Sequence, residues 1–301
     1  MFFQDAQTAR SGTLSAIRKV EEVMLNNDFE FDNLIKIALE EDAPYGDVTT
    51  ESLEIRGNGK GVFLAKEDFV LCGFNIASKV FKYIQKDAKV LSKYKDGNFI
   101  KKGMQFGFVE GHLDTLLLGE RTALNFLQRL SGIATRTKWA VNILRGTKAT
   151  LLDTRKTTPL FRNLEKYAVR VGGGTNHRMG LSDAILIKDN HIECMGSVTE
   201  AIKKAKKYNP FKKVEVEVKN LKEFEEALKC KPDIILLDNF SLEDIKKAVK
   251  LKSKDIPLEA SGGITLENLS SVAKCGVDFI SMGSLTHTVK AIDISFEIKR
   301  I

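Results

Sequence analysis

Cysteine is scarce in the sequence, and the few cysteines are not paired. None of them lies in a Cys-x-x-Cys motif; the four are Cys72, Cys194, Cys230 and Cys275. Disulfide-rich secreted domains and cysteine-based zinc sites both require closely and regularly spaced cysteines. We therefore expect free thiols in a reducing compartment, and a cytoplasmic protein.

Long apolar segments are also lacking. No uninterrupted apolar run reaches the roughly 18 residues of a transmembrane helix. The N-terminal stretch MFFQDAQTARSGTLSAIRKVEEV has no apolar centre of the kind found in a secretory signal. We expect no membrane association, and we treat residues 1–27 as an N-terminal extension whose role the sequence does not decide.

Several catalytic and binding signatures are absent as well. The sequence contains no G-x-S-x-G motif and no reactive-cysteine context, so it does not predict a covalent nucleophile. His177 and His191 form neither an H-E-x-x-H nor an H-x-H pair, which argues against a histidine metal site. No RNP-like aromatic pattern or zinc finger is found. Chemistry by charge stabilisation and positioning fits these absences better.

The charge balance is mildly basic. The net charge is +7, from 47 Lys and Arg residues against 40 Asp and Glu residues. This excess favours anionic partners without choosing among phosphate metabolites, nucleic acid and acidic lipid. The densest basic run, KKAKKYNPFKK at 203–213, is typical of the solvated end of a helix followed by a turn. We therefore expect no nucleic-acid partner.

The sequence pattern changes near residue 130. Before it, residues 31–42 have the pattern of an amphipathic helix, 44–50 form a turn, and 59–74 contain short strand-like runs broken by glycine. Apolar residues at three- and four-residue spacing over 116–146 predict one long helix or two short ones.

After residue 145, β-rich runs alternate with helical patterns. The runs are 149–154, 184–188, 214–218, 233–238, 257–261 and 278–283. Such alternation indicates βαβ units and a parallel sheet. The spacing favours an α/β fold of the (β/α) barrel type with fewer than eight strands. An open doubly wound sheet is the alternative.

Polar residues or glycines follow each of these runs. They are Asp153, Thr154, Arg155, Lys156, Lys188, Glu217, Asp238, Ser261-Gly262-Gly263 and Gly283-Ser284. The carboxyl ends of the strands carry the active site in α/β barrels. We therefore expect these residues to surround one site.

Cations are prominent among them. Arg155 offers a planar fork suited to a carboxylate or phosphate, and Lys156 offers a point charge. His177 and Arg178 precede the apolar strand AILIK, and Lys188 ends it. We expect an anion-binding group here, with the neighbouring glycines 172–174 shaping the loop.

The run VEVEV places two glutamates on the interior face of a strand. Period-two alternation separates Glu215 and Glu217 from the valines. We expect Glu217, nearer the mouth, to meet ligand, and Glu215 to pair with a structural cation. Asp238 ends the next run, and two carboxylates with water suit Mg²⁺.

Two glycine-serine loops follow the last two strands. ASGGIT at 260–265 and SMGSLT at 281–286 can direct backbone N–H groups and a serine hydroxyl at a phosphate. Barrels often bind phosphate with the loops after their late strands. The pair predicts a phosphate monoester site.

Long stretches of the sequence resemble the quinolinate phosphoribosyltransferase family. They are EDAPYGDVTT, ERTALNFLQRLSGIAT, DTRKTTP, EKYAVRVGGGTNHRMGLSDAILIKDNHI, VEVEV, LLDNF, EASGGI and LTHTVKAIDISFEI. The resemblance covers about residues 30–300, and PLFR at 159–162 departs from the Pro-Gly-Leu-Arg of many members. It implies an N-terminal α/β sandwich domain at 28–130 with the tail 288–301 packed on it. An incomplete α/β barrel would follow at 131–287.

The resemblance implies a reaction and a set of site residues. Quinolinate and phosphoribosyl pyrophosphate would give nicotinate mononucleotide, pyrophosphate and CO₂ with Mg²⁺, in de novo NAD synthesis. The implied substrate-binding residues are Arg121, Thr154, Arg155, Lys156, His177, Arg178, Lys188, Glu217, Asp238, Ser261, Gly262, Gly263, Met282, Gly283 and Ser284.

Individual roles follow from the same resemblance. Glu217 and Asp238 would serve the ribose hydroxyls and Mg²⁺, Lys156 would face the pyrophosphate, and Lys188 is a second candidate for that role. These four are the candidate catalytic residues. Arg121 would come from the other subunit of a homodimer with shared active sites; the sequence leaves open whether dimers assemble further.

Two other functions compete with this reading. A phosphoribosyltransferase of the same fold acting on nicotinate or another ring acid would release no CO₂. A non-catalytic phosphate- or RNA-binding barrel would show strongly salt-dependent oligonucleotide binding and no turnover.

Overall fold

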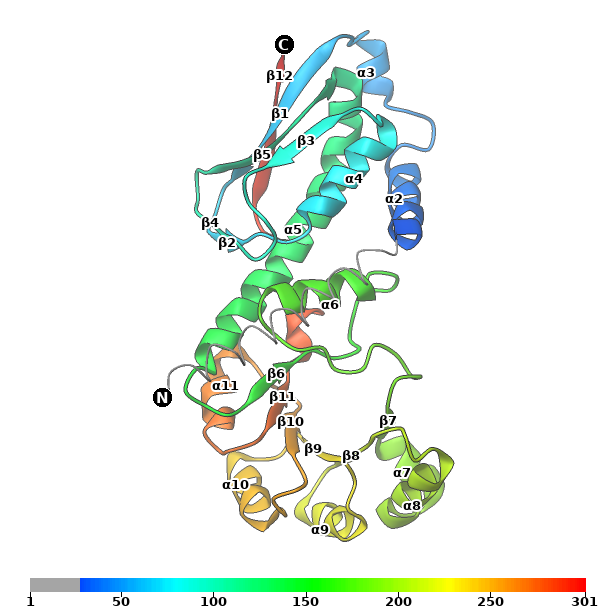
Figure 1. The fold of residues 1–301 in the computed structure, drawn as a ribbon, viewed down its shortest axis with the longest axis vertical. Coiled ribbons are helices and arrows are strands. Elements are labelled where there is room, and N and C mark those ends of the chain that lie inside the picture. The colour runs from blue at the N-terminus through cyan, green and yellow to red at the C-terminus, as the bar shows by residue number, and fades with distance from the viewer. Residues whose placement is uncertain (1–27) are drawn as a thin grey trace, which may run out of the picture.

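The computed structural model describes residues 28–301 and has two lobes joined by one long helix (Figure 1). The extension expected at 1–27 lies outside the described residues. Helix α5, Leu113–Ile143, is 31 residues long and runs from the upper lobe of Figure 1 into the lower one. The spacing over 116–146 thus corresponds to one helix. The predicted change near residue 130 falls inside it.

The first lobe packs helices against an antiparallel sheet. Its sheet has the order β12-β1-β5-β3. The strands are β1 (Asn58–Ala65), β3 (Lys89–Ser92), β5 (Gln105–His112) and β12 (Ile294–Arg300), with a separate small sheet of β2 (Phe69–Val70) and β4 (Phe99–Ile100). The helices are α2 (Asp28–Asp42), α3 (Val48–Ser52) and α4 (Phe74–Ile84).

Aromatic side chains join the tail of the chain to this lobe. The rings of Phe63 on β1 and Phe296 on β12 have centroids 4.7 Å apart, and Phe81 stacks on Phe296 at 5.4 Å. Gly61 makes the approach possible, because a Cβ there would lie 1.9 Å from the Phe296 ring. The last strand is therefore an integral part of the first lobe.

The second lobe is an incomplete barrel of parallel strands. Its strand order is β6-β11-β10-β9-β8-β7. The strands are β6 (Thr150–Leu152), β7 (Ile185–Ile187), β8 (Val214–Val218), β9 (Ile234–Asp238), β10 (Leu258–Ser261) and β11 (Phe279–Ser281). Around them lie α6 (Arg162–Val171), α7 (Asp189–Met195), α8 (Val198–Tyr208), α9 (Leu221–Cys230), α10 (Leu242–Leu251), α11 (Leu266–Ala273) and the 3₁₀ turn η1 (Gly283–Leu285).

The strand order decides between the two predicted architectures. The first strand of this lobe, β6, pairs with the last, β11, as it does when a barrel closes. Within the described chain, the sheet is open only between β6 and β7. A doubly wound sheet would instead reverse its order in the middle. The predicted incomplete barrel is confirmed.

Local sequence explains how the barrel helices begin. Ser197, Asn220, Ser241 and Thr265 lie at the starts of α8 to α11, and each side chain accepts a backbone N–H of the first turn. Because Asn220, Ser241 and Thr265 each stand a few residues after a strand, α9, α10 and α11 begin near the carboxyl ends of the strands, whereas Ser197 follows α7. No helix between residues 28 and 301 is long and apolar enough to cross a bilayer.

Candidate active site

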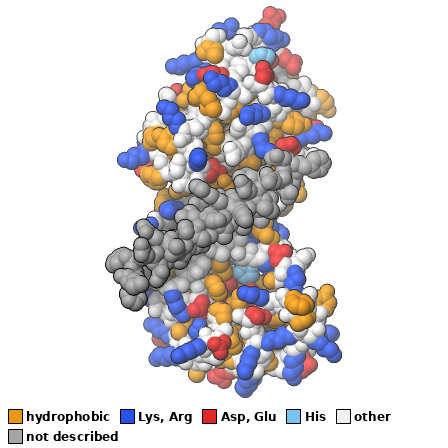
Figure 2. All heavy atoms as spheres, in the orientation of Figure 1, with side chains coloured by type: hydrophobic (Ala, Val, Ile, Leu, Met, Phe, Trp, Pro, Cys, Tyr) orange, Lys and Arg blue, Asp and Glu red, His pale blue; other side chains and the backbone are white. Residues whose placement is uncertain are grey.

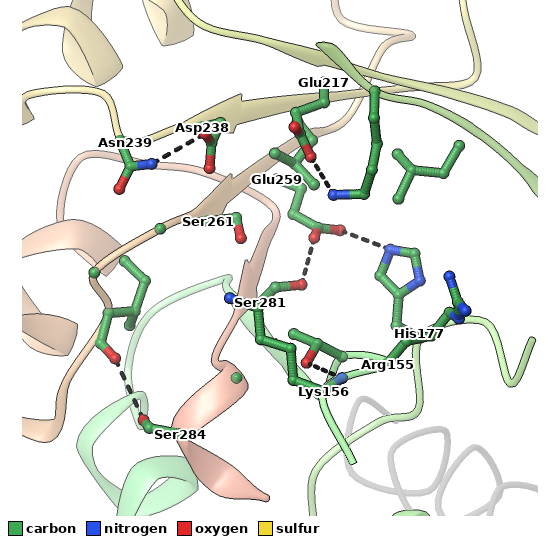
Figure 3. Close-up of a pocket in the computed structure, with 18 of the residues that line it drawn as sticks. Arg155, Lys156, His177, Glu217, Asp238, Asn239, Glu259, Ser261, Ser281 and Ser284 are labelled. Carbon is green, nitrogen blue, oxygen red and sulfur yellow. Dashed lines mark hydrogen bonds and ion pairs between the residues drawn. The ribbon is translucent and has the colours of Figure 1, made fainter. Parts of the chain in front are cut away.

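A cavity of about 880 Å³ opens at the carboxyl ends of the barrel strands (Figure 3). It is lined by side chains from every strand end of the second lobe. Those predicted from the sequence are Thr154, Arg155, Lys156, His177, Arg178, Lys188, Glu217, Asp238, Ser261, Gly262, Gly263, Gly283 and Ser284. The structure thus brings most of the predicted residues into one site.

An ion pair between α5 and α6 holds the loop after β6 in place. Glu165 on α6 has a fully buried side chain and accepts two hydrogen bonds from Arg129 of α5, the shorter at 2.5 Å. Arg129 and Glu165 also bond the hydroxyl and the backbone N–H of Thr158. The Thr286 hydroxyl donates to the carbonyl of Lys156 at 2.6 Å. These contacts fix the segment that presents Arg155 and Lys156.

A second buried ion pair fixes the loop that carries His177. Lys166 on α6 donates to Asp153 at 2.5 Å and to the carbonyl of His177 at 3.1 Å, and Asp153 accepts the N–H of His177 at 2.8 Å. Burial raises the pKa of Asp153 and lowers the pKa of Lys166, so each group depends on the other to stay charged. Asn176 donates a further hydrogen bond to Asp153.

Two arginines crowd one side of the cavity. Burial and then the nearby charge of Arg155 lower the pKa of Arg178. The Nε of Arg155 is buried and has no hydrogen-bond partner within the described part of the chain. The guanidinium of Arg178 donates one hydrogen bond to the carbonyl of Ala184, at 3.2 Å. Within residues 28–301 neither arginine forms an ion pair, and two neighbouring cations of this kind are arranged to receive an anion.

Lys188 and Glu217 pair across β7 and β8. The ammonium lies 2.7 Å from the carboxylate, and about half of the lysine side chain is exposed. Asp238 follows on β9, where Asn239 donates to it at 3.0 Å. The carboxylates therefore sit on adjacent strands at the mouth, as the sequence predicted.

The two glycine-serine loops face the same cavity. Gly262 has a φ of +90°, and a Cβ there would lie 2.3 Å from Oδ1 of Asn239. Ser261 on β10 pairs directly with Asp238 on β9. On the neighbouring loop after β11, a Cβ on Gly283 would lie 3.1 Å from the Lys156 side chain. Only glycine lets the backbone approach this closely, which suits a backbone cradle for phosphate.

Comparison with known proteins identifies the family. Residues 47–131 match the family model "Quinolinate phosphoribosyl transferase, N-terminal domain", and residues 133–297 match its C-terminal domain. The chain belongs to the quinolinate phosphoribosyl transferase family. The resemblance stated from the sequence is confirmed.

Curated and solved relatives agree with this membership. A probable nicotinate-nucleotide pyrophosphorylase [carboxylating] of Bacillus subtilis is 41% identical over 273 residues, which is 90% of this chain and 94% of the relative. The crystal structure of NadC from Streptococcus pyogenes is 43% identical with a TM-score of 0.86, covering 91% of this chain and 98% of that one. A human nicotinic acid phosphoribosyltransferase, at 11% identity and a TM-score of 0.57, shares the fold alone.

Two residues implied by the family pattern lie outside the cavity lining. Arg121 is exposed on α5, the helix that links the two lobes. Met282 is fully buried, and its N–H donates to the carbonyl of Leu152. Its side chain packs in the core, so Met282 can contribute to the site only through its backbone, next to Gly283. Both assignments stay predictions.

Sequence reasoning missed several residues that line the site. They are Leu186, Asp189, Leu236, Asn239, Glu259, Ile264, Thr265, Ser281 and His287. Glu259 is the most unusual of them, because its side chain is ionisable and yet fully buried. A signal was available: Glu259 stands two residues before Ser261 on the same strand, so period-two alternation aims both inward.

Glu217 and Asp238 fit a magnesium site in this phosphoribosyl transferase. Both are oxygen donors on adjacent strands and line the cavity. Mg²⁺ binds through one or two carboxylates, keeps several waters and takes substrate phosphates as further ligands. Among the described residues, the group of three or more possible ligands that lies close enough for a metal is a different one, His177, Glu215 and Glu259.

Proposed function

We propose that the protein converts quinolinate and phosphoribosyl pyrophosphate to nicotinate mononucleotide, pyrophosphate and CO₂, in de novo NAD synthesis. One observation carries this proposal: a single cavity combines a cluster of crowded cations with a separate glycine-serine cradle. Such a site suits a small dianion beside a phosphorylated sugar. The family description names quinolinate and a phosphoribosyl group, and the name of the Bacillus subtilis relative adds a nicotinate nucleotide, which supports the proposal.

The cationic side of the cavity suits the two adjacent carboxylates of quinolinate. Arg155 and Arg178 provide planar forks that match carboxylates in a bidentate manner. The mutual repulsion of the two arginines is relieved when a dianion binds between them. Leu186 of β7 and Leu236 of β9 line the same cavity and offer apolar contact for a ring.

The opposite side suits the phosphorylated ribose. The backbone around Ser261–Gly263 and Gly283–Ser284 would bind the 5′-phosphate, and Glu217 and Asp238 would accept hydrogen bonds from ribose hydroxyls. The Lys156 side chain lies beside Gly283 in the same cavity, and its ammonium would neutralise the leaving pyrophosphate. Mg²⁺, when bound by Glu217 and Asp238, would add positive charge at that leaving group.

The reaction then needs positioning and charge stabilisation. The anomeric carbon–oxygen bond breaks, pyrophosphate leaves, and the ring nitrogen donates its electron pair to the anomeric carbon. The carbon–carbon bond to the 2-carboxylate breaks next, with its electron pair retained by the pyridinium ring, and C2 gains a proton. The fixed arginines orient the ring for both steps, a role in which preorganised charges lower the barrier.

The direct test is turnover with product analysis. Purified protein with quinolinate, phosphoribosyl pyrophosphate and Mg²⁺ should release stoichiometric CO₂ and nicotinate mononucleotide. Turnover of nicotinate without CO₂ would replace this proposal by the related phosphoribosyltransferase. Omitting Mg²⁺ in the presence of a chelator should abolish the reaction.

A small-molecule substrate fits the surface better than a nucleic-acid partner does. On the face shown in Figure 2, outside the grey atoms, basic side chains are interspersed with acidic ones over both lobes. A nucleic-acid footprint would gather them in a patch or stripe. We also propose a cytoplasmic location, which the four free cysteines support.

A further inference from the structure

A cluster of acidic groups surrounds His177, and one of them, Glu259, lines the cavity beside it (Figure 3). Nε2 of His177 is 3.0 Å from Oε2 of Glu215 on β8 and 3.6 Å from Oε2 of Glu259 on β10. The hydroxyl of Ser281 on β11 donates to the other oxygen of Glu259. Both glutamates and the serine are buried.

The cluster holds more acceptor oxygens than donors. Oε1 of Glu215 and Oε2 of Glu259 are buried without a hydrogen-bond partner in the described chain. Burial first, and then the charge of Glu215, raise the pKa of Glu259 to about 8. One proton on Glu259 removes the repulsion between the carboxylates and gives the unpartnered oxygens a donor.

The tautomer of His177 argues against a metal ion in this cluster. Its Nδ1 accepts the backbone N–H of Arg178 at 2.7 Å, so the ring proton is on Nε2, where it points to Glu215. A metal on Nε2 would move that proton to Nδ1, against the N–H of Arg178. The geometry therefore favours a hydrogen-bonded cluster over metal ligation.

We propose that Glu259 is a positioning residue of the substrate site: as a neutral acid beside the Glu215 carboxylate, it holds His177 in the Nε2–H form. His177 in turn fixes the backbone of Arg178. The cluster then carries one negative charge instead of two, which leaves the cations above it free for a dianion. This inference rests on the proposed function for the identity of that dianion.

Other polar and charged groups lie next to Glu259 and His177. Glu215 and Ser281 face Glu259 from β8 and β11. Burial lowers the pKa of His177, whereas the hydrogen bond to Glu215 and the charges of both glutamates raise it, and the overall direction is upward. The N–H of Arg178 opposes a second proton on the ring, and the charge of Lys166 on α6 acts in the same sense.

Ionisation of Glu259 then has a defined effect on binding. Above a pH of about 8, Glu259 adds a second negative charge to the cavity wall. One added negative charge beside the cavity repels a bound dianion and should weaken its binding at least about tenfold, at an effective dielectric constant near 20. Quinolinate itself does not titrate there.

The experiment compares Glu259→Gln, Glu259→Ala and the control Glu226→Gln, which lies on α9 away from the site. Quinolinate binding by calorimetry should weaken between pH 7 and pH 9 in the wild type and in Glu226→Gln. It should stay level in Glu259→Gln, which keeps a neutral hydrogen-bonding side chain. Glu259→Ala should bind at least about tenfold more weakly at pH 7, and Glu259→Gln should restore most of that loss.

Nitrogen NMR of the ligand-free protein tests the tautomer without any substrate. Nε2–H imidazole at His177 at pH 7 supports the proposal, and an imidazolium overturns it. An alkaline loss of binding that is equal in Glu259→Gln also overturns it, as does stoichiometric binding of Zn²⁺ or Mn²⁺ that this variant abolishes. If the wild type binds no quinolinate, the proposed function fails, and the NMR result still decides the role of Glu259.

Discussion

At the scale of single residues, the site is defined by like charges that are kept close together. Burial and then the charge of Arg155 lower the pKa of Arg178, and the repulsion between the two cations reduces the stability of the ligand-free protein. An anion between the two guanidinium groups attracts both of them and outweighs their mutual repulsion. The residues are therefore arranged for the complex rather than for the free protein.

Arg155→Ala should reduce kcat/KM for quinolinate at least about 100-fold, because it removes a charged donor worth roughly 3 kcal/mol to the transition state. The control is Arg145→Ala, an exposed arginine after α5, which should change kcat/KM less than twofold. Steady-state assays of CO₂ release measure both. A near-normal value for Arg155→Ala would remove this residue from the site.

Glu259 should also affect stability as a function of pH. Its pKa is about 8 in the folded protein and near 4.5 when unfolded, so between these values the folded chain binds the extra proton. Stability from this group is therefore lost as the pH rises from 4.5 to 8. Thermal denaturation should show Glu259→Gln gaining stability over the wild type at pH 8.5, with little difference near pH 4.

Glu226 provides a control of opposite sign. Hydrogen bonds from the backbone and hydroxyl of Thr199 lower the pKa of Glu226. Its contribution is present above the unfolded pKa and is lost as the pH falls. Glu226→Gln should thus be neutral or destabilising at pH 8.5. A gain there equal to that of Glu259→Gln would mean that the effect is not specific to the cluster.

At the scale of elements, the Asp153–Lys166 pair couples β6, α6 and the His177 loop. Both side chains are fully buried. Lys166→Met would leave a buried carboxylate without its counter-ion, a change that typically costs 3–5 kcal/mol. Urea denaturation should show a loss of about that size.

Lys148→Met is the matched control, because Lys148 also pairs with an aspartate, Asp278, but its side chain is about half exposed. Exposed pairs contribute at most about 1 kcal/mol. A similar loss in both variants would contradict the importance of burial at Lys166.

The sequence predicted elements well and contacts between strands poorly. The runs around β8 and β9 show clear strand patterns, and parallel strands bring their carboxyl ends to one edge, so Glu217 and Asp238 were placed correctly. Glu259 was missed because a single glutamate in a short run has no visible partner. Its partners Glu215 and Ser281 come from other strands, and only the folded barrel brings them together.

At the scale of the whole molecule, the position of Arg121 is informative. It is exposed on α5 and does not line the cavity of its own chain. We propose a homodimer in which Arg121 reaches the cavity of the other subunit, as the family pattern implies. The sequence could not show this, because an arginine on a helix surface is ordinarily solvated.

Mixing Arg121→Ala subunits with Lys188→Ala subunits tests the shared site. Each variant alone should be nearly inactive. In a mixed dimer one cavity receives both intact residues, so random exchange should restore about a quarter of wild-type activity, since half of the dimers are mixed and each has one intact site. No recovery with subunit exchange verified by mass spectrometry would refute the shared site.

The pairing of β12 with β1 has a consequence for the order of folding. During synthesis, every barrel strand leaves the ribosome before β12 does, and until then Phe63 has no Phe296 against which to pack. The first lobe to be translated is thus the last that can complete its sheet. Its aromatic face stays uncovered while the barrel is made, and this interval is where the nascent chain is most exposed to aggregation and chaperone capture.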